Sequence, residues 1–94
     1  MEQERKAIAL LEVQAFVAAI AGLDAMVKAA NVRLIHTEKR LGGRLVTVVV
    51  EGTVSDCQAA AEAGRAAAAQ VGHVKLCEVI PNPHPEITKF LYVG

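Results

Sequence analysis

The chain of 94 residues has few aromatic residues and no excess of charge of either sign. It has no tryptophan, one tyrosine and two phenylalanines, and its ten basic residues are balanced by ten acidic ones. Proteins that bind nucleic acids need a basic surface, and those that bind single strands also need aromatic rings on which bases stack. The sequence therefore predicts no nucleic-acid partner.

Long apolar runs are also absent, and the longest falls far short of the roughly 20 residues that span a bilayer. We therefore expect no membrane partner. The N-terminus, residues 1–6, is charged and leads directly into a strand pattern, which predicts that the chain has no signal peptide. These features predict a cytoplasmic protein.

The chain has two cysteines, Cys57 and Cys77, which lack CxxC spacing and form no metal-ligand cluster with the three histidines. We expect both to be small, reduced core residues, and we expect neither a metal nor a cofactor. Local motifs suggest no serine–histidine–acid set, and the Gly-Gly pair at 42–43 lacks the lysine and spacing of a P-loop. No catalytic residue is predicted.

Alanine is abundant instead: 53% of the residues are apolar and seventeen are alanine. Small side chains pack closely, but each buries little area, so the core is thin for its apolar content. The length predicts one domain, residues 1–94, that is only modestly stable alone. A subunit that completes its burial against copies of itself fits this composition, although composition alone also fits a compact monomer with alanine-rich helices.

Apolar periodicity predicts a first helix over about 15–30. Its larger apolar residues recur on one face: Phe16, Ile20, Leu23 and Val27. On the opposite face Asp24 precedes Lys28 by four residues, which is the favourable order for a helical ion pair. We expect Asn31 to end this helix in the left-handed conformation.

A second helix is predicted over about 55–71. Ser55 and Gln58 fit a capping box at its start, and Gly72 stands where a helix-ending glycine is expected. Small residues lie along one face and favour close approach to a sheet or to the other helix: Ala60, Gly64, Ala67 and Val71.

Strand patterns occupy four segments, 6–13, 32–40, 45–50 and 73–80. The glycines at 42–43 support a hairpin turn, and prolines end the last strand before a short terminal helix over 85–91. The order βαββαβ followed by a short C-terminal helix predicts an α+β sandwich of ferredoxin-like type. In it, both main helices cover one face of an antiparallel sheet.

Three segments, in this order and spacing, resemble the hexamer-forming, single-domain shell proteins of bacterial microcompartments (the BMC domain). They are Leu-Asp-Ala-Met-Val-Lys-Ala-Ala-Asn-Val at 23–32, Leu-Val-Thr-Val-Val-Val-Glu-Gly at 45–52 and Val-Ile-Pro-Asn-Pro-His at 79–84. The resemblance covers about 7–91 and implies the same fold and no enzymatic activity.

It also implies a homohexamer that tiles with neighbouring hexamers and other shell proteins around encapsulated enzymes, with a central pore for small polar or anionic metabolites. A small oligomeric, ligand-binding regulatory module of ferredoxin-like fold remains the alternative.

The resemblance also implies residues at the hexamer edge. Asp24 and Lys28 match the Asp-Ala-Met-Val-Lys motif, whose lysine lies against its counterpart on the neighbouring hexamer. Asn82 stands where the family often has arginine, and it cannot reproduce the forked donor geometry of that side chain. His84 matches the family pattern. Without the resemblance, Lys28 is a solvated helix residue and His84 a capping or turn residue beside prolines.

The segment that corresponds to the family's pore loop consists of Arg40, Leu41, Gly42, Gly43 and Arg44. It is one residue longer than the family's Lys-Ile-Gly-Ser-Gly type of loop and carries an extra arginine. Six copies of it around an axis would place arginines near the lumen and favour anionic solutes, with Arg44 the first candidate. Taken alone, Gly-Gly is only a hairpin turn.

Overall fold

The computed structural model describes residues 6–93. Residues 1–5, on which the expectation about a signal peptide depends, lie outside the described part. The elements are, in chain order, β1 (Ala7–Val13), α1 (Phe16–Ala29), β2 (Arg33–Arg40), a 3₁₀ turn (Leu41–Gly43), β3 (Leu45–Gly52), α2 (Val54–Ala69), β4 (Val74–Pro81) and α3 (Pro85–Val93). Every strand and helix predicted from the sequence is present.

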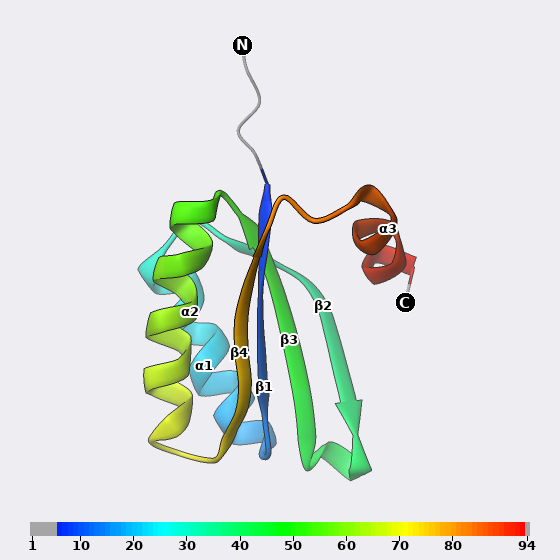
Figure 1. Ribbon diagram of the computed structural model, residues 1–94. Coiled ribbons are helices and arrows are strands. Elements are labelled where there is room, and N and C mark those ends of the chain that lie inside the picture. The colour runs from blue at the N-terminus through cyan, green and yellow to red at the C-terminus, as the bar shows by residue number, and fades with distance from the viewer. Residues whose placement is uncertain (1–5, 94) are drawn as a thin grey trace.

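The four strands form one antiparallel sheet in the order β2-β3-β1-β4. Helices α1 and α2 cover one face, and α3 lies on the other side of the sheet near β2 (Figure 1). The predicted ferredoxin-like sandwich is therefore confirmed. Ile8 pairs with both Glu51 and Ile80, and Glu51 pairs with Arg33, so β1 and β2 begin at the end of the sheet where β3 and β4 finish.

The core lies between the sheet and the two long helices. Alternate residues of the central strands face the helices: Ala7, Ala9, Leu11 and Val13 on β1, and Val46, Val48 and Val50 on β3. The helices meet through two glycines. A Cβ on Gly22 would lie 2.5 Å from Leu11 Cδ2, and a Cβ on Gly64 would lie 2.5 Å from Met26 Cγ, so neither site has room for a side chain.

The large apolar residues predicted on one face of α1 do not face the core, apart from Leu23, which is partly buried against it. Phe16, Ile20 and Val27 are 48%, 52% and 45% exposed. The buried residues of α1 are a smaller set: Ala18, Ala19, Gly22 and Met26. Close contact with α2 requires small residues on that side, so the helix is rotated with its bulk outward.

The expected end of α1 is wrong in detail, because Asn31 does not adopt a left-handed backbone. Ala30 ends the helix in an extended conformation, and its N–H donates to Met26 O. The N–H of Asn31 instead donates to Asp56 Oδ1 at 3.4 Å, which ties the chain after α1 to the first turn of α2. This contact between helices replaces the local cap.

The predicted capping box of α2 is also wrong. The N-cap is Thr53, whose Oγ1 accepts the N–H of Asp56 at 3.1 Å and whose hydroxyl donates to Asp56 Oδ2 at 3.1 Å. Ser55 is an exposed residue inside the first turn. Thr53 and Ser55 are each followed three residues later by a polar side chain that could complete a cap, so the sequence alone did not show which of them is the N-cap.

At the other end of α2, Gly72 is not left-handed. A Cβ there would lie 2.9 Å from Ala18 Cβ, so glycine is required for contact with α1 rather than for a backbone turn. The predicted small face is correct for Ala60 and Gly64, whereas Val71 is exposed. The remaining buried positions of α2 are Cys57, Ala61 and Ala68.

Candidate functional site

The loop between β2 and β3 lies at the end of the sheet opposite to the end of β4 (Figure 1). Leu41, Gly42 and Gly43 all have positive φ, at 54°, 66° and 90°. Glycine adopts this region freely, but leucine does so at a cost of roughly 1–2 kcal/mol. A Cβ on either glycine would meet nothing within 4 Å, so the backbone conformation, not crowding, requires the two glycines.

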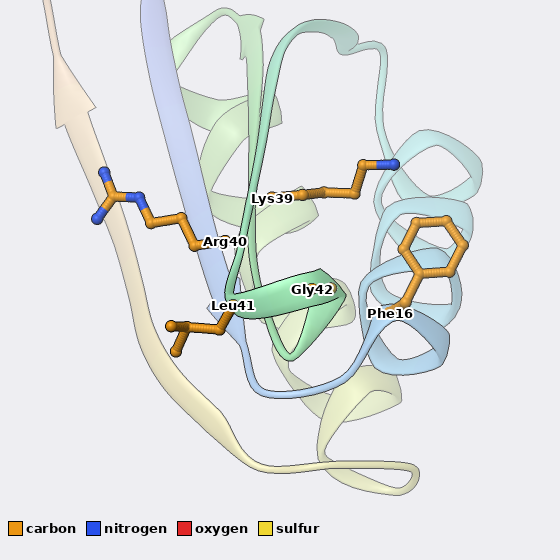
Figure 2. Close-up of a pocket in the computed structure, with 6 residues that line it drawn as sticks. Phe16, Lys39, Arg40, Leu41 and Gly42 are labelled. Atoms are coloured by element: carbon orange, nitrogen blue, oxygen red, sulfur yellow. The ribbon is translucent and has the colours of Figure 1, made fainter.

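Each cationic side chain next to this turn has a partner within the chain. Arg44 Nε donates to Leu41 O at 3.1 Å, and Arg40 Nε donates to Glu38 Oε2 at 3.5 Å. Lys39 Nζ lies 5.3 Å from the centre of the Phe16 ring. Figure 2 shows Lys39 and Phe16 on the side of the loop that faces α1, with Arg40 and Leu41 pointing away from that helix.

The acidic partner at this site is Glu38. Its hydrogen bond with His36 and its contact with Arg40 lower the pKa of the Glu38 carboxyl, so it stays ionised at neutral pH. His36, Glu38 and Arg40 alternate along β2 and therefore project from the same face of the strand. The carboxylate thus sits between an imidazole, to which it is hydrogen-bonded, and the Arg40 guanidinium, which carries the opposite charge.

Leu41 is the most prominent side chain of the turn. It is 64% exposed, and its two neighbours in the turn, Gly42 and Gly43, have no side chains to cover it. An open hollow of about 490 Å³ lies between the turn and the start of α1 and is lined by Phe16, Lys39 and residues 40–43. Of the five predicted pore residues, Arg40 ends β2, residues 41–43 form the turn and Arg44 follows it, so the tip carries one large apolar side chain and no polar one.

The predicted ion pair on α1 is present. Lys28 Nζ lies 2.9 Å from Asp24 Oδ2, and both side chains are exposed. An exposed pair of this kind contributes at most about 1 kcal/mol to stability. The Lys28 head group and its apolar stem are therefore accessible to another molecule.

The two other predicted edge residues lie in the link between β4 and α3. Asn82 has a φ of 52°, a conformation that asparagine tolerates better than most residues, and its N–H donates to Lys6 O at 2.9 Å. His84 Nδ1 accepts the N–H of Glu86 at 3.1 Å, so this histidine caps α3, as its alternative interpretation predicted. Both side chains are exposed, and no hydrogen bond or ion pair among residues 6–93 joins them to Asp24 or Lys28.

Sequence reasoning missed one charged cluster. Glu51 on β3 is only 6% exposed, and its Oε1 accepts bonds from Arg33 Nε and Nη2 at 3.3 Å and lies 3.8 Å from Lys6 Nζ. Arg33 is its partner in the β2–β3 register. The cluster fastens β2, β3 and the start of β1 at the end of the sheet remote from the loop. Only the strand register, which the sequence does not show, brings these residues together.

Both cysteines are free thiols. Cys57 is fully buried, and Cys77 is half-buried, with its Sγ donating to Ala61 O at 3.5 Å. Burial raises the pKa of both thiols, so they remain protonated at neutral pH. Within residues 6–93 the His, Cys and acidic side chains form no group that could hold a metal ion. None of the described helices has the length and apolar character needed to cross a bilayer.

Comparisons with known proteins agree on one family. The family model for the BMC domain matches residues 7–83. The bacterial microcompartment shell protein PduA of Citrobacter freundii is 49% identical over 94 residues, which are 100% of this chain and 98% of that protein. The shell protein EutM of Escherichia coli strain K12 is 42% identical over 89 residues, which are 95% and 91% of the two chains.

A solved structure gives the same result for the fold. The crystal structure of a microcompartment protein from Desulfitobacterium hafniense DCB is similar with a TM-score of 0.82 and 30% sequence identity. The match covers 95% of this chain and 48% of the solved one, so this chain spans about half the length of that structure.

Proposed function

The chain belongs to the BMC-domain family of bacterial microcompartment shell proteins, and on this premise we propose that it is a structural subunit of such a shell. In this proposal it is not an enzyme. It forms cyclic homohexamers that tile edge to edge with other shell proteins in the cytoplasm and enclose a set of enzymes. A pore on the six-fold axis, lined by residues 40–44, passes small polar or anionic metabolites.

The exposed apolar side of α1 carries this proposal. Three of its large side chains are close to half exposed, and the neighbouring Val17 is 62% exposed. Complete burial of such a side chain is worth about 1.5–3 kcal/mol relative to full exposure, so covering what remains exposed gives about 1 kcal/mol for each. A ring of identical subunits covers this surface on every copy, because each subunit presents one face to one neighbour and a different face to the other.

The shape of the subunit supports placing one end at the six-fold axis and the other at the edge of the hexamer. The molecule is 41 Å long in its largest dimension, and the 40–44 loop and the Asn82–His84 link lie at opposite ends of the sheet. Helix α1 ends at Ala29, only four residues before β2 begins, so Lys28 lies toward the same end as the link. One end can thus reach the axis while the other meets a neighbouring hexamer.

Native mass spectrometry and negative-stain electron microscopy of the purified chain test the proposal. We expect hexamers and extended hexagonal sheets. Ile20→Lys should shift the population toward monomers, because it places a charge in the proposed subunit interface. Ala66→Lys, at an exposed position on α2, is the matched control and should leave the hexamer intact.

A stable wild-type monomer at micromolar concentration would contradict the proposal. Discrete small oligomers that form no sheets and bind a ligand saturably would instead favour the regulatory module. Equal effects of the two lysine substitutions would show that the exposed side of α1 is not the interface.

A further inference from the structure

We propose that Leu41 forms an apolar collar at the hexamer axis, and that this collar rather than a ring of arginines decides which solutes cross. Small uncharged solutes pass, and small ions of either sign are held back. This inference rests on the proposed hexameric pore. Of the small polar and anionic solutes proposed above, it keeps the uncharged polar ones and excludes the anions.

The first support is the position of Leu41 in the loop. The turn 41–43 contains a single side chain, because its other two residues are glycines. Among the large apolar side chains that the structure describes, Leu41 is the most exposed. If the turn points to the axis, the six leucines are the side chains that come nearest to it.

The second support is the backbone. Leu41 has a φ of 54°, which glycine and asparagine accept readily and leucine does not. Leucine therefore suits this position neither by its conformation nor by its exposure to water. A residue that is unfavourable on both counts in the free subunit is consistent with a role that depends on its side chain in the assembly.

The third support is the placement of the neighbouring charges. Arg44 donates to the carbonyl of Leu41 itself, Arg40 donates to Glu38, and Lys39 lies over the Phe16 ring. These contacts engage each cationic group on its own subunit. The tip therefore carries an apolar side chain. The positive charge of Arg40 is partly offset by Glu38, and that of Arg44 by the dipole of the Leu41 carbonyl.

A narrow apolar ring selects by desolvation. An ion must lose part of its hydration shell in the ring and finds no polar side chain there to replace it. Hydrophobic constrictions in channels exclude ions in the same way, because water leaves the constriction and an ion cannot cross it with its hydration shell. A neutral solute of equal size loses much less, so the ring discriminates by charge rather than by size.

Cross-linking tests the geometry. In Leu41→Cys, a disulfide between two copies of residue 41 is necessarily between subunits, and it requires Cα atoms within about 7 Å. Because the side of a regular hexagon equals its radius, such a disulfide also places residue 41 within about 7 Å of the axis. We expect covalent dimers on mild oxidation of Leu41→Cys, and none from the wild type or from Val71→Cys, an exposed control outside the loop.

Permeation tests the selectivity. Acetate, acetamide and acetamidinium have nearly the same size and shape and carry charges of −1, 0 and +1. Across sheets on a porous support, we expect acetamide to cross at least about tenfold faster than either ion, a barrier difference of about 1.4 kcal/mol. Leu41→Asn, which suits the left-handed backbone, should bring the three rates close together, whereas Val71→Asn should leave the wild-type order unchanged.

The outcomes separate the two proposals. If native mass spectrometry shows no hexamer for the wild type, the proposed function fails and the collar fails with it. Hexamers whose Leu41→Cys variant does not cross-link, or whose sheets pass the three solutes at equal rates, overturn the collar alone. Faster passage of acetate than of acetamide, abolished in Arg44→Ala, would overturn it in favour of the arginine ring.

Discussion

The direct contact between α1 and α2 makes Gly64→Ala the sharpest test of the fold. The added Cβ would lie 2.5 Å from Met26 Cγ, 3.1 Å from Met26 Sδ and 3.2 Å from Gly22 O. Met26 is fully buried, so its side chain has little room to withdraw, and the carbonyl of Gly22 belongs to the backbone of α1. The two helices must separate to admit one methyl group.

Two effects of opposite sign decide the magnitude. Replacing glycine with alanine inside a helix gains about 1 kcal/mol in helix propensity. Inserting a methyl group into a well-packed core costs typically about 1–3 kcal/mol. The short contacts involve both a buried side chain and a backbone carbonyl of α1, so we expect the upper part of this range and a net loss of about 1–2 kcal/mol. For a domain of this size, each kcal/mol lowers the Tm by about 4–8 °C.

Circular dichroism during thermal unfolding measures the change, at one fixed protein concentration because the proposed assembly would also raise the Tm. Ala66→Gly, on the exposed side of the same helix, is the control and should show the propensity effect alone, a loss of about 1 kcal/mol. In a Met26→Ala background the clash is relieved, and Gly64→Ala should cost less than it does in the wild type. A higher Tm for Gly64→Ala than for the wild type would mean that α1 and α2 separate easily and that their close packing does not limit stability.

Two further predictions concern the cap of α2 and the proposed edge. Thr53→Ala should lower the free energy of unfolding by about 1 kcal/mol because it removes the acceptor of the Asp56 N–H. Ser55→Ala should change it by less than about 0.5 kcal/mol. Denaturant titration of both variants decides which residue is the cap. Lys28→Asp should leave hexamers intact in native mass spectrometry and abolish extended sheets in electron micrographs, because it removes the long stem and places carboxylates near one another across the edge. The control is Asp24→Asn, which keeps Lys28 but removes its ion pair and should still form sheets. Normal sheets from Lys28→Asp at the same salt concentration would show that Lys28 is an ordinary surface residue.

The order of the elements could be predicted from the sequence because each one carries a distinct periodicity. The β-branched run at 45–50 and the 3.6-residue spacing in 15–30 place β3 and α1 to within about two residues at each end. Six such segments in the order βαββαβ leave few ways to bury their apolar faces, so the topology followed from them. The ion pair of Asp24 and Lys28 was equally local, because four residues of a helix bring its two groups together.

Features that depend on three-dimensional contacts could not be predicted in this way. Arg33 and Glu51 are neighbours only in the β2–β3 register, and nothing local sets that register. Asn31 was expected to cap α1, but its N–H bonds to Asp56 on another helix. The 40–44 loop was located correctly as a turn, yet the partners of Arg40 and Arg44 depend on side-chain directions that a sequence does not specify.

The two faces of α1 carry different apolar residues, and in the proposed hexamer one face serves folding and the other serves assembly. Apolar periodicity identified the side with Ile20, but hydrophobicity alone does not distinguish a core face from an exposed apolar face. The packing does, because contact through Gly22 and Gly64 admits only small side chains and leaves the large ones outward. Substitutions on the two sides should therefore fail differently: Gly64→Ala should lower stability because it acts on the core, whereas Ile20→Lys should dissociate subunits that remain folded. A variant of Ile20 that unfolded the monomer would place that residue in the core and remove the main physical support for a hexamer.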